Sequence, residues 1–290
     1  EEITDAEFGN VIQKVQQRNY EQIRRDFKKE TGHSELEVRL LNGALLEVKI
    51  DNREVVNPVG FGGKEVSCGL FNSYIAKRHL KIFENIITAL KLDIVYMAFE
   101  PYTVFRVLCA ENSISDFILV DIGGSSTEVS VIRKGRLDDA RSISIGGSSF
   151  TRRVSENLKM SLFEAENVKR KFSEGRVSKS AAKKIESAMA ADLQVFVRGL
   201  EMVLLDLSQT SLLPSNIYLY GGGSSMPVIL KVILQPKWRN SLSFSSGLEV
   251  SQLTPLWTTP FALAKSYMTE QSDVGETNKF IKRSLRLIQN

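Results

Sequence analysis

Apolar residues in the first part of the chain recur first at helical and then at alternating spacing. From about residue 5 to 29 they keep helical spacing, and Thr31-Gly32 supplies a stop. Apolar and polar residues then alternate over 36–40 and 44–50, which predicts two strands. The dipeptide Asn42-Gly43 between them suits a tight turn, so we expect a β-hairpin here.

The rest of the N-terminal region continues this small α+β pattern. A glycine-rich loop over 58–63 is followed by a predicted strand near 65–71 and a helix from about 75 to 90. Residues 1–95 are therefore expected to form one α+β unit.

From residue 94 the pattern becomes that of an α/β domain. The predicted elements are, in order, a strand at 94–98, a helix at 101–110, strands at 117–120, 129–133 and 142–145, helices at 150–158, after Ser161 and over about 182–207, a strand at 217–220, a helix at 227–233, a strand near 242–245 and a helix over about 260–268. Ser161 and Glu164 have the spacing of a capping box. No G-x-G-x-x-G follows a strand, so this is not the start of a dinucleotide-binding fold.

Composition narrows the function classes. Hydrophobic residues make up 42% and charged residues 25%, and the net charge of +4 does not indicate nucleic acid as a partner. The two cysteines are not spaced as a metal site, and two histidines leave little material for a histidine metal centre or a Ser-His-Asp hydrolase. We expect a reduced, cytoplasmic protein. No run of about 18 apolar residues predicts a membrane span, and the start at Glu1-Glu2 suggests a trimmed or truncated product.

The first candidate site is the turn that follows the strand ending at Asp121. Gly123 and Gly124 would let backbone N–H groups approach phosphate oxygens, and the hydroxyls of Ser125, Ser126 and Thr127 add donors. Asp121 could hold the water shell of a Mg²⁺ ion or orient a water molecule. A tight hairpin that merely favours glycine is the alternative.

Two further features could belong to the same site. Gly221, Gly222, Gly223 and Ser224 again follow a predicted buried strand, so a flat ligand or another backbone would lie directly on this turn, unless it is only a flexible turn before a helix. Glu166 and Lys169 share one helix face, so both could reach one ligand or form a solvated ion pair.

The order of these motifs resembles the second lobe of the actin-like ATPases. The resemblance implies an α/β fold with actin-like (ribonuclease H-like) lobes and an inserted small α+β subdomain. It implies that residues 121–128 are the second phosphate motif, that Gly221–Ser224 are the adenosine motif, and that Glu166 and Lys169 contact ribose and adenine. Gly146 and Gly147 would join the nucleotide site. ATP and Mg²⁺ are the expected cofactors, with Asp121 as the catalytic residue and as the Mg²⁺ contact through water.

Within this superfamily the sequence motifs are most similar to those of FtsA. The segments that carry the similarity are Asn57–Lys64, Ile145-Gly146-Gly147 with Phe150-Thr151, Glu164–Lys169 and Pro260–Ala264. The resemblance as a whole covers about residues 35–270. The resemblance implies an ATP-binding scaffold of bacterial cell division, peripheral on the inner face of the cell membrane. Its expected partners are the tubulin-like division protein, other divisome proteins and further copies of itself in filaments.

The resemblance also implies a domain plan. Residues 1–95 would be the extra α+β subdomain, 96–114 and 255–270 remnants of the first lobe, 115–254 the second lobe, and 271–290 a linker and tail. Two departures matter: the family pattern has glycine and Asp where this chain has Ser125 and Glu128, and no Asp-x-Gly hairpin precedes Asp121. We therefore expect at most a weak ATPase.

The C-terminal segment adds a separate indication. On a helix, Phe280, Ile281, Leu285, Leu287 and Ile288 would fall on one side and Lys279, Lys282, Arg283 and Arg286 on the other. A basic amphipathic helix of this kind can lie in an anionic membrane surface, or it could pack on its own lobe.

Two other functions stay open. A pilus-assembly scaffold of the PilM type shares the lobes and the extra subdomain, and would bind a peptide of a membrane partner. A polyphosphate phosphatase is the enzyme alternative, because Ser126, Thr127 and Glu128 are closer to that family's wording.

Overall fold

The computed structural model describes residues 2–31, 38–209, 211–235 and 242–272. The predicted membrane-facing residues of the tail, from Phe280 to Ile288, lie outside these ranges. The chain divides into two compact units, one formed by Glu1–Phe99 with Tyr267–Asn290 and the other by Glu100–Ser266. The assignment of the N-terminal region as an extra subdomain and of two segments as first-lobe remnants stays a prediction.

The first unit is a helix packed on a three-stranded antiparallel sheet. Its elements are α1 (Asp5–Thr31), β1 (Val38–Ile50), β2 (Arg53–Val55), β3 (Val66–Ala76) and α2 (Lys77–Ala89), and the strand order is β2-β1-β3. Phe8 and Ile12 of α1 pack with Val48 of β1 to form its core. The helical spacing of the first segment is thereby confirmed, and its apolar side is the side that is buried.

The hairpin predicted at Asn42-Gly43 is wrong. These residues lie inside β1, which pairs with β3 from end to end, with register shifts on either side of this point. The Asn42 side-chain oxygen accepts hydrogen bonds from the Ser73 hydroxyl and the Phe99 amide, at 2.9 and 2.7 Å. The tight turn comes later, at Asp51 and Asn52, both with positive φ. A full-length partner strand, distant in sequence, outweighs the local turn preference.

Gln16 is the one residue on the buried side of α1 that does not fit an apolar core. It lies one turn after Ile12 and is 0% exposed, yet neither its side-chain nitrogen nor its oxygen has a hydrogen-bond partner among the described residues. The Tyr74 hydroxyl on β3 is likewise unpaired there, and its ring lies 6.3 Å from that of Tyr20 on α1. The contact between α1 and the sheet therefore carries an unsatisfied polar patch.

Replacing Gln16 with Met is expected to raise the free energy of unfolding by about 1–2 kcal/mol, because it removes a buried amide that lacks partners and keeps the side-chain shape. Urea unfolding measures this. The control Gln13→Met, at an exposed position of the same helix, should change stability by less than about 0.5 kcal/mol. A loss of stability on Gln16→Met would contradict the prediction.

The second unit is built on a five-stranded mixed sheet. Its strands are β4 (Phe117–Ile122), β5 (Thr127–Arg133), β6 (Arg136–Ile143), β7 (Asn216–Tyr220) and β8 (Glu249–Gln252), in the order β6-β5-β4-β7-β8. The first three strands are antiparallel neighbours, whereas β4, β7 and β8 are parallel. The carboxyl ends of β4 and β7 thus lie at the same edge of the sheet, where ligands of open α/β sheets usually bind.

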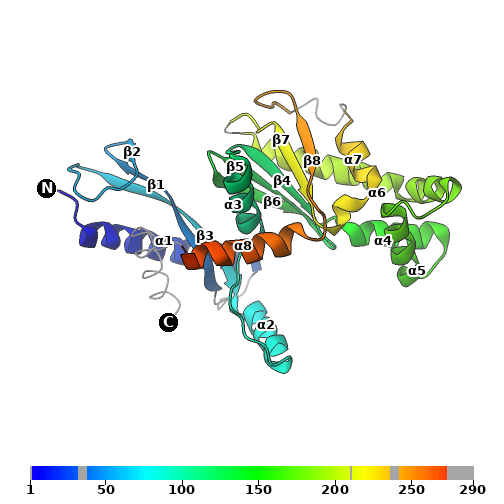
Figure 1. Ribbon diagram of the computed structural model, residues 1–290, viewed down its shortest axis with the longest axis horizontal. Helices are drawn as coiled ribbons and strands as arrows, with labels where there is room; N and C mark the ends of the chain where they lie inside the picture. Colours follow the sequence, from blue (N-terminus) through cyan, green and yellow to red (C-terminus); the bar gives the residue numbers. More distant parts are fainter. Residues whose placement is uncertain (1, 32–37, 210, 236–241, 273–290) are drawn as a thin grey trace. The chain divides into compact units, whose positions relative to one another are not determined.

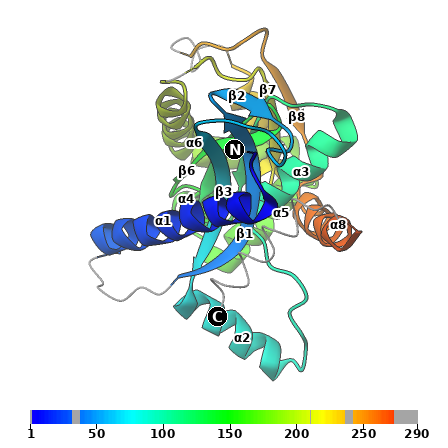
Figure 2. The same ribbon diagram turned by 90° about the vertical axis from the view of Figure 1, so that its left-hand side faces the viewer.

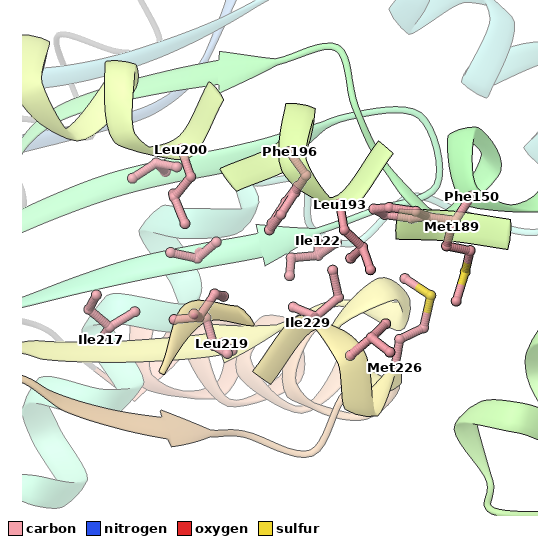
Figure 3. Packing of buried hydrophobic residues seen from close by; sticks show 14 of the residues in the cluster. Ile122, Phe150, Met189, Leu193, Phe196, Leu200, Ile217, Leu219, Met226 and Ile229 are labelled. Atoms are coloured by element: carbon pink, nitrogen blue, oxygen red, sulfur yellow. The ribbon is translucent and has the colours of Figure 1, made fainter. Parts of the chain in front are cut away.

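Helices cover both faces of this sheet (Figure 1, Figure 2). On one face lie α4 (Gly147–Leu158), α5 (Leu162–Ser173), α6 (Lys179–Leu207) and α7 (Pro227–Ile233); on the other lie α3 (Glu100–Asn112) and the first part of α8 (Thr258–Ser272). Figure 3 shows the core of the first face, where Phe196 and Leu193 of α6 pack toward Ile122. Each fully buried aliphatic or aromatic side chain of this core stabilises the fold by about 1.5–3 kcal/mol.

Local signals for the helices of this unit are confirmed. Ser161 and Glu164 form the predicted capping box of α5, and Pro227 occupies the first turn of α7. Two predicted strands are wrong: residues 94–98 form no strand, and residues 242–245 make only an isolated bridge from Phe244 to Leu213. Apolar runs this short do not fix a strand unless a neighbouring strand is available for pairing.

Candidate functional site

Three side chains form one row across the end of the sheet. In the strand register, Asp121 of β4 lies opposite Glu128 of β5 on one side and Tyr220 of β7 on the other. Tyr220 is fully buried, and its hydroxyl has no hydrogen-bond partner in the described part of the chain. The carboxylate of Glu100, at the start of α3, accepts a hydrogen bond from the Thr259 hydroxyl of α8 and adds its charge to the row.

Burial and neighbouring charges make the carboxyl groups of Asp121 and Glu128 hard to ionise. Burial, and then the charges of Glu100 and Glu128, raise the pKa of Asp121 to about 7. Burial, followed by the charge of Glu100, raises the pKa of Glu128 to about 7 as well. Burial and the same three carboxylates raise the pKa of the Tyr220 phenol well above its ordinary value. Near neutral pH this edge of the sheet therefore favours a proton or another positive charge.

The raised pKa of Asp121 predicts a pH-dependent stability. A carboxyl group whose pKa is raised by folding stabilises the fold below its unfolded pKa, and this contribution is lost as the pH rises through about 7. In the absence of Mg²⁺ and nucleotide, the gain in stability on Asp121→Asn should grow as the pH rises from 3.8 to about 7, so it should be larger at pH 8 than at pH 5. Because the carboxyl is only partly buried, solvent screening limits the gain to about 1–2 kcal/mol. Urea unfolding at both pH values tests this, and equal destabilisation at both would contradict it.

The loop between β4 and β5 presents its amides outward. The Gly123 amide donates to the Ser126 carbonyl at 3.0 Å, which closes the turn. The backbone amides of Gly124, Ser125 and Ser126 have no hydrogen-bond partner among the residues that the structure describes, and all three residues are exposed. Consecutive free amides in a tight turn form a concave donor surface suited to a phosphate group.

Gly146 and Gly147, at the start of α4, support the backbone of this loop. The amides of Gly147 and Ser148, at the start of α4, donate to the carbonyls of Gly123 and Gly124 at 2.9 and 2.8 Å. A side chain on Gly146 would come within 2.7 Å of both carbonyl oxygens. These glycines are predicted as nucleotide contacts; in the structure they support the backbone of the loop between β4 and β5, and the amides of Gly147 and Ser148 donate to it.

The triple-glycine turn lies directly on the end of β4. A Cβ atom on Gly221 would be 2.0 Å from an Asp121 carboxyl oxygen, and one on Gly223 would be 2.4 Å from the Ile122 side chain. Gly222 is exposed, and among the described residues only Leu256 Cδ2 comes within 4 Å of its Cβ position, at 4.0 Å. Of the two predicted occupants of this turn, another backbone thus lies on Gly221 and Gly223, and space for a ligand is left at Gly222. The Ser224 hydroxyl donates to the Gly221 carbonyl.

Lys169 is a clamp between two helices. Its ammonium group is buried and donates to the Gly147 carbonyl and the Thr151 hydroxyl at 2.9 and 2.7 Å, and it pairs with the Glu166 carboxylate at 2.7 Å. Burial acts to raise the pKa of Glu166, but the hydrogen bonds from Lys169 and Thr151 hold that pKa below its ordinary value. All three ammonium protons have acceptors, so Lys169 is committed to α4, while the Glu166 side chain stays 43% exposed.

Among the predicted site residues Thr127 also has an internal contact, and two neighbours of the site, Glu100 and Tyr220, were not predicted. The buried Thr127 hydroxyl donates to the Ile145 carbonyl at 2.7 Å, so it supports the connection between β6 and α4. No group of three His, Cys, Asp or Glu residues within the described ranges is arranged to hold a metal ion by itself. Glu100 comes close to Asp121 only through tertiary packing of α3, which the sequence does not show. Tyr220 lies beside Asp121 through the pairing of β4 with β7, and its place at the end of a strand could be read from the sequence.

Comparison with known proteins supports the predicted family over part of the chain. Residues 118–246 match the family model of FtsA, described as "Cell division protein FtsA". The cell division protein FtsA of Bacillus subtilis (strain 168) is 27% identical over 164 residues, which are 50% of this chain and 37% of that protein. The chain therefore spans well under half of this relative's length. The resemblance to FtsA is confirmed, over a shorter range than the expected 35–270.

Solved structures extend the likeness of the fold. A chain of the PilM-PilN type IV pilus biogenesis complex superposes with a TM-score of 0.59 at 17% identity, covering 93% of this chain and 73% of that one. The ethanolamine utilization protein EutJ from Carboxydothermus hydrogenoformans gives a TM-score of 0.47 at 23% identity, covering 62% of this chain and 59% of that chain. The predicted α/β actin-like fold class is confirmed.

Proposed function

We propose that this FtsA-like chain is an ATP-binding, actin-like scaffold of bacterial cell division that tethers the tubulin-like division polymer to the membrane. The observation that carries the proposal is that both glycine loops follow strands whose carboxyl ends lie at one edge of the sheet, with Gly221 and Gly223 packed against Asp121 and Ile122, inside the matched range 118–246. The three free amides of Gly124–Ser126 supply the donors for phosphate oxygens, and Gly222 leaves open space at the same edge.

The carboxyl row sets a condition for binding. Asp121, Glu128 and Glu100 would repel a triphosphate, so nucleotide binding should require a divalent cation. A bound Mg²⁺ ion supplies charge that offsets both the phosphates and these carboxylates. Asp121 would hold its water shell, and the same side chain can accept a proton from an attacking water molecule near neutral pH. Because Ser125 stands where the family has glycine, we propose that binding rather than turnover is the output.

A groove on the helical face offers a surface for a protein partner. It lies between α6 and α7, has a volume of about 660 Å³, and combines apolar and charged lining residues, namely Glu186, Ala190, Leu193, Gln194, Val197, Arg198, Glu201, Val228, Lys231, Val232 and Gln235. A short amphipathic segment of the tubulin-like protein would bury apolar side chains here and pair its charges at the rim.

No helix within the described ranges is long and apolar enough to cross a membrane. Membrane attachment is proposed for the basic tail from Lys279 to Ile288.

Co-sedimentation tests the proposal. The full chain should pellet with filaments of the tubulin-like division protein and, separately, with anionic vesicles. A variant that ends at Ser272 should keep the first interaction and lose the second. The pilus alternative predicts binding to a short peptide of a pilus membrane protein and none to the division filaments. Pelleting with neither filaments nor vesicles would exclude the division role.

A further inference from the structure

The segment between β8 and α8 exposes a group of large apolar side chains. Leu256 is 71% exposed, Trp257 69% and Phe261 55%. The Trp257 ring has no aromatic partner and no cation over it within the described residues. An exposed group of this size beside a candidate site usually marks a contact with a ligand or a partner.

Contacts before and after Trp257 in the chain hold this segment at the edge of the sheet where the carboxyl ends of β4 and β7 lie. The Leu253 amide donates to the Leu219 carbonyl of β7 at 2.8 Å. Leu256 approaches the exposed Gly222, whose Cβ position lies 4.0 Å from Leu256 Cδ2. Two residues after Trp257, the Thr259 hydroxyl donates to Glu100, whose charge acts on Asp121. Trp257 therefore lies between two anchors that both belong to the carboxyl edge of the sheet.

The clamp role of Lys169 leaves the base of a nucleotide without its expected cationic contact. The Lys169 ammonium is buried and has acceptors for each of its three protons. A planar base needs a flat apolar surface, and stacking on an aromatic side chain contributes about 1–3 kcal/mol per base. Leu256 lies next to Gly222, and the exposed ring of Trp257, the next residue in the chain, offers such a surface.

We propose that Leu256 and Trp257 form the stacking surface for the base of the bound nucleotide. This inference rests on the proposed nucleotide binding and names the residues that recognise the base. Stacking depends little on the identity of the base. The site should therefore bind ATP and GTP with similar affinity, within about fivefold, whereas a pocket that reads the base by hydrogen bonds would reject the wrong one much more strongly.

Calorimetric titration of the full chain with Mg²⁺-ATP, Mg²⁺-GTP and Mg²⁺-tripolyphosphate tests this. Trp257→Ala should weaken ATP and GTP binding about tenfold and leave tripolyphosphate binding unchanged, because tripolyphosphate has no base. Trp257→Phe should stay within about threefold of the wild type. The matched control Phe163→Ala, at an aromatic residue of α5 that is 77% exposed, should bind all three as the wild type does.

The outcomes separate this inference from the proposed function. If the wild type binds neither ATP nor tripolyphosphate, both fail. If it binds ATP and Trp257→Ala binds ATP equally well, or loses tripolyphosphate to the same extent, only the stacking surface fails and the apolar group serves another contact. A preference for ATP over GTP of more than about tenfold would also overturn it. Thermal unfolding confirms that each variant is folded.

Discussion

Gly221→Ala is expected to lower the free energy of unfolding by about 3–5 kcal/mol and to abolish nucleotide binding. Gly221 has φ 81° and ψ 158°, a conformation that is nearly exclusive to glycine. Its new Cβ atom would also lie 2.0 Å from the Asp121 carboxyl and 2.7 Å from the Ile122 carbonyl oxygen. Strain and overlap act on the same residue, and both displace the end of β4.

Two glycines provide matched controls for the unfolding experiment. Gly175 has φ 69° but nothing within 4 Å of its Cβ position, so Gly175→Ala should cost only about 1 kcal/mol. Gly222→Ala meets only Leu256 at ordinary contact distance and should fold as the wild type does. If Gly221→Ala destabilised the chain no more than Gly175→Ala, the close approach of Gly221 to Asp121 and Ile122 would be wrong. An insoluble Gly221→Ala beside two soluble controls agrees with the prediction.

Lys169→Met is expected to cost about 2–3 kcal/mol of stability. The substitution removes the Lys169 ammonium from the Gly147 carbonyl and the Glu166 carboxylate, which leaves the single Thr151 hydroxyl to donate to only one of them, and it releases α5 from the start of α4. The exposed Lys171 on the same helix is the matched control, and Lys171→Met should change stability by less than about 0.5 kcal/mol. Urea unfolding of both variants gives the comparison.

The Lys169 experiment distinguishes a clamp from a ligand contact. If Lys169 held the nucleotide directly, Lys169→Met would keep wild-type stability and lose affinity. With a clamp, removing both charges as Glu166→Leu with Lys169→Met should recover part of the lost stability, because no single charge is left unpaired. No recovery in the double variant would contradict the clamp.

Sequence patterns predicted the second unit well because its signals are local. Buried strands lead into glycine turns, and the capping box at Ser161 and the proline at 227 mark helix starts that depend on a few neighbouring residues. The order of these elements was sufficient to predict the resemblance to FtsA, which the match over residues 118–246 confirms.

Strand pairing and turn positions that depend on segments distant in the sequence could not be predicted. Asn42-Gly43 has the local signature of a turn, but β3 supplies a partner along the whole of β1, and the turn forms at Asp51-Asn52. Residues 94–98 have a strand pattern but form no strand. A pattern states which faces a segment can bury, whereas pairing depends on which strand lies next to it.

The candidate site shows the same division. The two glycine loops were recognised as one site from their sequence, and the structure brings Gly221 and Gly223 onto Asp121 and Ile122. The role of each glycine was not readable, because whether a glycine faces a ligand or a neighbouring backbone depends on the packing of another loop. The raised pKa of Asp121 depends on Glu100, which comes from a different helix.

We propose that the free amides of Gly124, Ser125 and Ser126 hold the phosphates of a nucleotide. Titration of the isotopically labelled chain with Mg²⁺-ATP, followed through its backbone amide resonances, tests this proposal. These three amides should shift most, Mg²⁺-tripolyphosphate should shift them in the same way, and the shifts should be lost without Mg²⁺. Saturable ATP binding that leaves these three resonances unmoved, or no binding at all, would contradict it.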